Sequence, residues 1–250
     1  MKRIRNITVK KIHQLSPNMK RITFTSKDFD DFPENENGGY IKFLFKKKTS
    51  DKNESLARPY TIRNFRKHKL ELDIDFSFHS GDKGYATKWA CEAKIGDKIT
   101  ISGPGPKQLI NNNSNWFFFI GDMTALPAIG SYLEQLNEDS KGYVVIEITS
   151  IDDKIYLNKP KQINIKWIVK SNNKNTDCFL NAVREIKWLD KKPYVWVACE
   201  FSKMKCLREY FQKEKRICKN EMYISSYWKS GLDQEEHKII KKEDSVKWFG

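Results

Sequence analysis

The second half of the chain contains four short stretches that are apolar at almost every position. They read WFFFIGD, YVVIEIT, INIKWIV and PYVWVACE. A strand with one face in water alternates apolar and polar residues, so continuous apolar runs indicate strands covered on both faces. Helical stretches such as ALPAIGSYLEQL and MKCLREYFQKEK separate them. Strands and helices in alternation predict a parallel sheet in a nucleotide-binding-like α/β domain.

The first 110 residues have a different texture, because their apolar and polar residues alternate over short segments. The segments are RNITVKKIHQL, KRITFTS, YIKFLFKK, YTIRNF, LELDIDFSF and DKITISGP. Six such strands with turn residues between them predict an antiparallel six-stranded β-barrel. The stretch GYATKWACEAKIGD interrupts them with a helical period, so one short helix is expected to cap the barrel, with Trp89 in the core.

A polar linker from Asn111 to Asn115 marks the best boundary between these two textures. We therefore expect a β-barrel domain at residues 1–110 and an α/β domain at residues 116–250. The lysine-rich end, KIIKKEDSVKWFG, is expected to continue a C-terminal helix.

Composition limits the class of protein. The chain has 250 residues, is 39% hydrophobic and carries a net charge of +14. Lysine and asparagine are abundant throughout and no nucleic-acid-binding signature accompanies the charge, so no nucleic-acid partner is expected. No apolar run approaches the ~18 residues of a membrane span and the first residues lack a secretory pattern, so a cytoplasmic protein is expected.

The five cysteines are odd in number and lack the close spacing of zinc or iron–sulfur ligands. We expect reduced, mostly structural thiols and no metal site. We also expect a monomer.

Residues 58–63 read RPYTIR, which concentrates charge and aromatic surface in one extended segment. Alternation along a strand predicts charged groups on one face and flat aromatic surface on the other. Arginine can form bidentate hydrogen bonds with phosphate oxygens and can stack on planar groups. The segment is therefore either a solvated edge strand or a phosphate clamp beside a ring-stacking platform.

Four ordered motifs carry a resemblance that covers nearly the whole chain. They are RPYTIR, DFSFHSGDKGYATKWA, GDMTALPAI and SSYWKSG. Together they resemble the siderophore-interacting proteins, which are FAD-dependent ferric-siderophore reductases of the ferredoxin reductase superfamily.

The resemblance implies that the barrel binds FAD. Arg58 would grip the pyrophosphate, Tyr60 would lie against the isoalloxazine, and the Thr61 hydroxyl would sit near N5, so Tyr60 and Thr61 are the candidate catalytic residues. Arg63 is either a further phosphate ligand or half of a surface ion pair. The complete FAD set is Arg58, Tyr60, Thr61, Arg63, Phe78, His79, Gly84, Ala86 and Thr87.

The resemblance also places NADPH or NADH at the end of the first apolar strand, where ligands bind open parallel sheets. The expected residues are Gly121, Asp122, Thr124, Ala125 and Pro127. An anionic ferric siderophore is expected near the C-terminal motif, with Lys229 and Trp228 as candidate ligands and Lys46, Lys47 and Lys48 as weaker ones.

These expectations combine into a cytoplasmic reductase that passes electrons from NAD(P)H through FAD, one at a time, to chelated ferric iron and releases ferrous iron. Ferredoxin is a possible alternative donor. The rival interpretations are a flavin reductase that serves a protein partner and a flavin-free basic binding module.

Overall fold

The computed structural model describes residues 3–48, 53–78, 84–170 and 177–249. The chain forms two compact units. Unit 1 comprises Met1–Leu109, Pro127–Gln135 and Asp152–Asn158, whereas unit 2 comprises Ile110–Leu126, Leu136–Ile151 and Lys159–Gly250. Two later segments of the chain therefore return to the unit that the N-terminal residues build.

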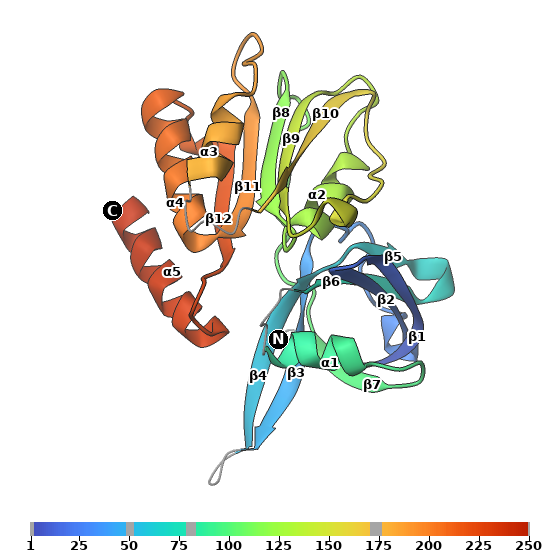
Figure 1. Ribbon diagram of the computed structural model, residues 1–250. Helices are drawn as coiled ribbons and strands as arrows, with labels where there is room; N and C mark the ends of the chain where they lie inside the picture. Colours follow the sequence, from blue (N-terminus) through green and yellow to red (C-terminus); the bar gives the residue numbers. More distant parts are fainter. Residues whose placement is uncertain (1–2, 49–52, 79–83, 171–176, 250) are drawn as a thin grey trace. The chain divides into compact units, whose positions relative to one another are not determined.

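Unit 1 is built on one antiparallel sheet that curls around a core (Figure 1). Its strands follow the order β4-β3-β7-β1-β2-β6-β5. They are β1 (Ile4–Ser16), β2 (Met19–Thr25), β3 (Tyr40–Lys48), β4 (Asn53–Thr61), β5 (Asn64–Arg66), β6 (Glu71–Ser77) and β7 (Lys98–Ser102). The sheet has seven strands where six were expected, because the segment YTIRNF is the end of β4 followed by the short separate strand β5.

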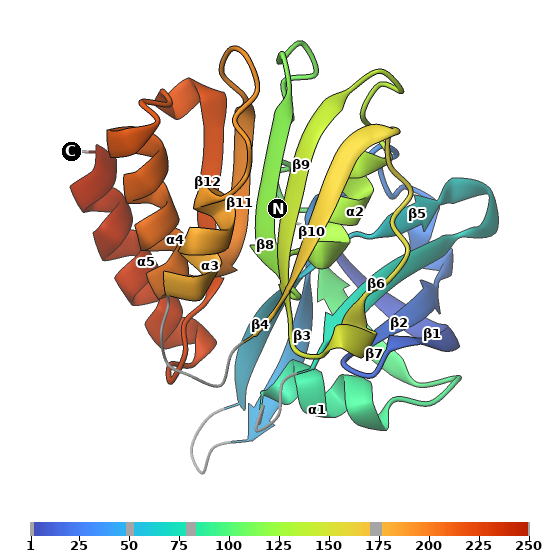
Figure 2. The ribbon, with the colours of Figure 1, turned by 45° about the horizontal axis from the view of Figure 1, so that its top comes forward.

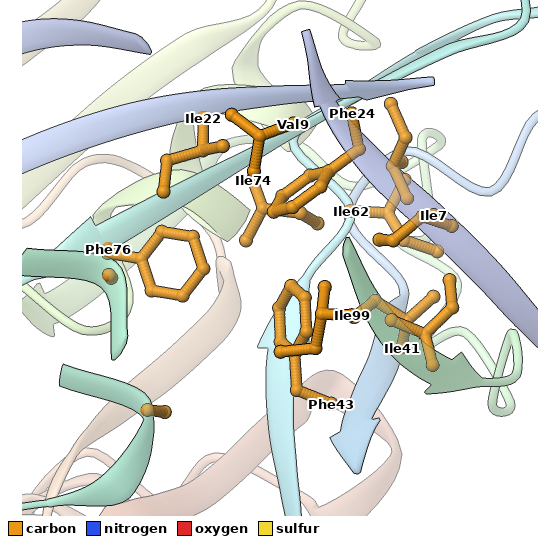
Figure 3. Packing of buried hydrophobic residues seen from close by; sticks show 14 of the residues in the cluster. Ile7, Val9, Ile22, Phe24, Ile41, Phe43, Ile62, Ile74, Phe76 and Ile99 are labelled. Atoms are coloured by element: carbon orange, nitrogen blue, oxygen red, sulfur yellow. The ribbon is translucent and has the colours of Figure 1, made fainter. Parts of the chain in front are cut away.

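Every second side chain of a strand points inward, and these apolar side chains fill the core of unit 1 (Figure 3). On β6, Leu72, Ile74 and Phe76 are fully buried in it, while the acidic residues between them lie on the opposite face. Helix α1 (Tyr85–Glu92) packs on the same core, and the Trp89 ring stacks on Phe24 with centroids 6.0 Å apart. The prediction that Trp89 is a core residue is confirmed. Burial of each such side chain stabilises the fold by ~1.5 to 3 kcal/mol.

Unit 2 contains a parallel sheet of five strands in the order β10-β9-β8-β11-β12. The strands are β8 (Phe117–Asp122), β9 (Lys141–Ile148), β10 (Gln162–Val169), β11 (Tyr194–Glu200) and β12 (Met222–Trp228). Every residue of β8 and β11 is buried, which confirms the prediction from the apolar runs. The fifth strand, β12, contains part of the SSYWKSG motif.

The remaining helices are α2 (Leu126–Leu133), α3 (Asp177–Arg184), α4 (Phe201–Glu209) and α5 (Gln234–Phe249). Apolar residues of α3 and α4 share one core with Phe118 and Ile120 of β8. The two helices lie side by side (Figure 2). Helix α5 confirms the expected helical tail and is held by a two-pronged ion pair between Arg208 and Asp244, with separations of 2.5 and 2.7 Å. No helix in the described part of the chain has the length and apolarity to cross a membrane.

Candidate functional site

Strand β4 positions the arginine–tyrosine pair in unit 1. In the antiparallel register, Arg58 lies opposite Phe43, and Tyr60 lies opposite Ile41. Paired residues share a face of a sheet, and both partners are core residues, so Arg58 and Tyr60 point to the same, inner face. The expectation of opposite faces is wrong, because residues two positions apart point the same way on a strand.

The Tyr60 ring is anchored by the core beneath it. Its centroid lies 4.5 Å from that of Phe76 and 5.5 Å from that of Phe43, the latter in an edge-on arrangement. The ring is nevertheless only half-buried, so part of its surface is accessible to a planar ligand. Thr61 is also half-buried and ends the strand.

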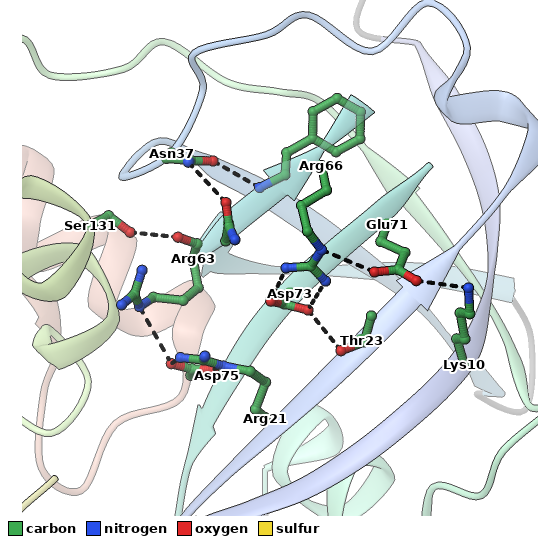
Figure 4. Close-up of polar contacts among 12 residues, drawn as sticks. Lys10, Arg21, Thr23, Asn37, Arg63, Arg66, Glu71, Asp73, Asp75 and Ser131 are labelled. Atoms are coloured by element: carbon green, nitrogen blue, oxygen red, sulfur yellow. Dashed lines mark hydrogen bonds and ion pairs between the residues drawn. The ribbon is translucent and has the colours of Figure 1, made fainter. Parts of the chain in front are cut away.

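Arg63 is an ion-pair residue (Figure 4). Its guanidinium donates to both carboxylate oxygens of Glu134, at 2.9 and 2.5 Å, and lies 4.0 Å from Asp75. Its backbone carbonyl accepts from the Ser131 hydroxyl, and its backbone N–H donates to the backbone carbonyl of Asp73. Of the two alternatives open for Arg63, the structure shows the ion pair, although the residue is buried rather than on the surface.

The same network extends across the outer face of β1, β2, β5 and β6 (Figure 4). Arg66 forms a bidentate pair with Asp73 and also donates to Glu71. Arg21 forms a bidentate pair with Asp75. Although burial by itself raises the pKa of Asp73, hydrogen bonds from Arg66 and Thr23 lower it overall. These charged side chains therefore pair with one another within unit 1.

The start of α1 provides the second element of the expected flavin site. Gly84 is the N-cap residue of this helix. Ala86 is buried and Thr87 is half-buried. Amide groups at a helix start favour an anion such as a phosphate.

The remaining candidate residues of unit 1 are Phe78, His79, Lys46, Lys47 and Lys48. Phe78 is half-buried against the core, with the Lys20 ammonium 5.5 Å from its ring centroid. His79 lies outside the described residues, as do the side chains of Lys47 and Lys48. Lys46 is exposed near the end of β3.

Unit 2 gathers its polar groups at the carboxyl ends of β8, β11 and β12. Asp122, the last residue of β8, is buried and accepts four hydrogen bonds. Its Oδ1 accepts from the Thr124 backbone N–H at 2.9 Å and from the Thr124 hydroxyl at 2.5 Å. Its Oδ2 accepts from the Glu200 backbone N–H at 3.0 Å and from Trp228 Nε1 at 2.8 Å.

Glu200, the last residue of β11, contacts both the start of α4 and the residues that follow β12. Its Oε2 caps α4 by accepting from the backbone N–H groups of Ser202 and Lys203. Its Oε1 accepts from the Ser230 backbone N–H and lies 3.3 Å from the Lys229 ammonium. Sequence reasoning missed Glu200, although an acidic residue between an apolar strand and a helix is a recognisable capping signal.

Lys229 and Trp228 therefore both have polar partners within unit 2. The Lys229 ammonium also donates to the Ser202 hydroxyl at 2.6 Å, and its side chain is 27% exposed. Trp228 is half-buried. Both residues keep accessible surface, as a ligand-binding role requires.

The expected nicotinamide turn shows a mixture of buried and accessible groups. Gly121 and Ala125 are buried, Thr124 is half-buried, and Pro127 begins the segment that belongs to unit 1. Burial, and then the charge of Asp122, raise the pKa of the neighbouring Cys199 thiol well above its usual range. The described residues contain no cluster of potential metal ligands.

Comparisons with known proteins cover both units. A sequence model described as siderophore-interacting FAD-binding domain matches residues 8–55 and 46–108, and one described as siderophore-interacting protein matches residues 114–231. Ferric vibriobactin reductase ViuB of Vibrio cholerae is 31% identical over 240 residues, which cover 89% of this chain and 88% of the relative. This chain belongs to the siderophore-interacting protein family.

Two further similarities agree with this membership. The crystal structure of the siderophore-interacting protein SipS from Aeromonas hydrophila has 29% sequence identity and a TM-score of 0.87, covering 98% of this chain and 99% of that one. The NADPH-dependent ferric-chelate reductase of Escherichia coli is 26% identical over 248 residues, which cover 90% of this chain and 93% of the relative.

The fold is also similar to that of a more distantly related protein. A ferredoxin-NADP+ reductase from Plasmodium falciparum has a TM-score of 0.65 at 18% identity, over 89% of this chain and 95% of that one. The predicted arrangement of an antiparallel, barrel-like sheet followed by a parallel α/β sheet is confirmed, as is the family resemblance.

Proposed function

We propose that this protein is a ferric-siderophore reductase that uses FAD to pass electrons from NADPH or NADH to chelated ferric iron. Its similarity to a ferric vibriobactin reductase over 89% of the chain supports this most directly. The name of the Escherichia coli relative supports both the class of reaction and NADPH as a donor. A cytoplasmic location and a monomeric state are part of the same proposal.

The residues of unit 1 fit FAD by the chemistry of their groups. Arg58 brings a guanidinium to the inner face of β4, beside the half-exposed ring of Tyr60. The start of α1 supplies backbone N–H groups suited to a pyrophosphate. Arg63 is left out of this set, because Glu134 and Asp75 use its guanidinium.

When bound, FAD supplies the ability to accept a hydride as two electrons and to pass them on singly. The protein's part is to bind and to orient. Tyr60 offers a fixed surface for the ring system, and Thr61 offers a hydroxyl at the end of the same strand. In unit 2, the Gly121–Thr124 turn is the proposed nicotinamide site, and Lys229 with Trp228 is the proposed chelate site.

Iron is the substrate in this proposal. Ferrous iron has lower charge density than ferric iron, so a chelator with hard oxygen ligands holds it less tightly after reduction. A cationic Lys229 favours an anionic ferric chelate.

Anaerobic kinetics test the proposal. The purified protein should bind FAD, its flavin absorbance should bleach with NADPH or NADH, and the colour should return when an anionic ferric catecholate is added, with ferrous iron trapped by a chromogenic chelator. Absence of FAD binding would favour a flavin-free binding module. Flavin reduction without transfer to ferric chelates would favour a reductase for a protein partner.

A further inference from the structure

Asp122 was expected to bind the nicotinamide nucleotide directly, but its surroundings suit a different role. It is 4% exposed, and each of its two carboxylate oxygens already accepts two hydrogen bonds from the protein. A further ligand would have to displace one of these donors. Because an unpaired buried charge is costly, displacement is unfavourable.

The four donors come from three places that the fold brings to one edge of the sheet. Two belong to Thr124 in the turn after β8, one is the backbone N–H of Glu200 at the end of β11, and one is the indole of Trp228 at the end of β12. A buried indole N–H needs an acceptor, so Asp122 fixes the orientation of the Trp228 ring.

Glu200 extends this arrangement to Lys229. Asp122 holds the backbone of Glu200, and the Glu200 carboxylate in turn contacts the ammonium of Lys229 and the backbone N–H of Ser230. The Trp228–Lys229 segment is therefore attached to Asp122 by two routes, one through the indole and one through Glu200.

We propose that Asp122 is a positioning residue that joins the Gly121–Thr124 turn and the Trp228–Lys229 segment into one rigid unit. This deepens the proposed function and rests on it, since the turn is the proposed nicotinamide site and the segment is the proposed chelate site. A nucleotide bound at the turn then changes the environment of Trp228 through the shared carboxylate, and binding at either place affects the other by the same factor.

The variant Asp122→Asn tests the link with little change in shape. An asparagine has one oxygen and one NH2 group in place of the two carboxylate oxygens. The two donors that now bind one of those oxygens must therefore face the NH2 group, which is itself a donor. Trp228→Phe removes only the indole donor and keeps an aromatic ring. Asp153→Asn is the matched control, because Asp153 is also a buried carboxylate with three donors, from Ser16 and Asn18, but lies in unit 1.

The first measurement needs no substrate. The chain has seven tryptophans, and the indole N–H signal of Trp228 in a protein labelled with ¹⁵N-tryptophan is identified by its loss in Trp228→Phe. In Asp122→Asn this signal should move upfield and exchange faster with solvent, because the charged acceptor is gone. Asp153→Asn should leave it unchanged. An unmoved Trp228 signal in a folded Asp122→Asn protein would overturn the proposal.

The second measurement uses NADP+ as the probe. Titration should shift the Trp228 signal in the unmodified protein, and this shift should be absent in Asp122→Asn. An equal shift in both proteins would show that Asp122 does not join the two sites. If NADP+ binds neither protein, the proposed nicotinamide role fails, while the signal of the ligand-free Asp122→Asn protein still decides whether Asp122 positions Trp228.

Steady-state kinetics supply a third measurement. Asp122→Asn and Trp228→Phe should each raise the KM for ferric catecholate by about tenfold, the effect of one charged hydrogen bond. The double variant should be no worse than Asp122→Asn alone, since both changes break the same link. Effects that multiply would overturn the proposal.

Discussion

Arg63 and Glu134 form a two-pronged ion pair although 71 residues separate them in the chain. The guanidinium side chain is 11% exposed and the carboxylate side chain is 33% exposed. The pair joins the end of the β4 region to the segment that follows α2, both within unit 1. This pair is the main partner that the structure gives to the second arginine of RPYTIR.

Replacing Arg63 should therefore cost stability and spare the cofactor. Arg63→Ala leaves Glu134 and the buried Asp75 without this cation, and the free energy of unfolding should fall by about 3 kcal/mol. Urea denaturation monitored by fluorescence measures the change. Arg184→Ala is the control, because the Arg184–Glu214 pair is about half exposed and should contribute less than about 1 kcal/mol. Equal losses in both variants would contradict the assignment.

Arg58→Ala should show the opposite behaviour. If Arg58 binds the flavin pyrophosphate, its removal should weaken FAD binding by about one to two decades, the range for a charged hydrogen bond. The urea midpoint of the FAD-free protein should hardly change. Flavin fluorescence titration of Arg58→Ala and Arg63→Ala side by side gives the comparison, and a variant of Arg58 with full FAD affinity would refute its proposed role.

Lys229→Gln should weaken docking of an anionic chelate without disturbing the fold. Glutamine removes the charge, is only one atom shorter than lysine, and avoids the repulsion that a glutamate would meet beside Glu200, which lies 3.3 Å from the Lys229 ammonium. The KM for an anionic ferric chelate should rise about fivefold at low salt and the difference should shrink at high salt, because exposed charges attract weakly and are screened. The exposed Lys98→Gln is the control.

A neutral ferric chelate provides the decisive comparison for Lys229. Its KM should be the same for Lys229→Gln and the unmodified protein. A similar rise for neutral and anionic chelates would mean that Lys229 acts through the local structure and not through its charge.

His237 should make the stability of the protein depend on pH. It is a buried residue of α5, where its Nε2 lies 2.9 Å from the Ser226 hydroxyl and no described group partners its Nδ1. Burial, and then the charge of Lys241, lower its pKa from 6.5 to about 4, while Glu200 opposes the shift. The folded protein therefore keeps His237 neutral where the unfolded chain protonates it.

The sign of this effect follows from proton binding. Between pH 6.5 and about 4 the unfolded state binds the extra proton, so stability falls as the pH falls, by at most about 3 kcal/mol. Urea midpoints measured from pH 7 to pH 4.5 should drop less steeply in His237→Gln than in the unmodified protein. The exposed His68→Gln should retain the full slope, and identical slopes in all three proteins would contradict the prediction.

The backbone architecture was largely predictable because it depends on local patterns. The continuous apolar run at Phe117–Asp122 marks a strand buried on both faces, and the strand is found there. The alternation at Glu71–Ser77 marks a strand with one core face, which is also found. Local periodicity did not show that β5 is separate from β4, because three residues are too few to show a period.

The side-chain pairings were not predictable, because they join residues far apart in the sequence. Nothing near Arg63 indicates that Glu134 is its partner. In the same way, Asp122 looks like a ligand at the end of a strand until Trp228, 106 residues later, is seen to donate to it. A sequence pattern identifies which groups stand at the edge of a sheet, but only the fold shows which of them are already occupied.

The discontinuous make-up of unit 1 has a consequence for how the protein is made. Glu134, the partner of Arg63, and Asp153, which accepts from Ser16 and Asn18, both come after the last residue of the unit's first segment, Leu109. A ribosome adding about 5 to 20 residues per second needs several more seconds to reach Asn158. During that interval Arg63 lacks the carboxylate of Glu134, and unit 1 is completed only when synthesis of unit 2 is well under way.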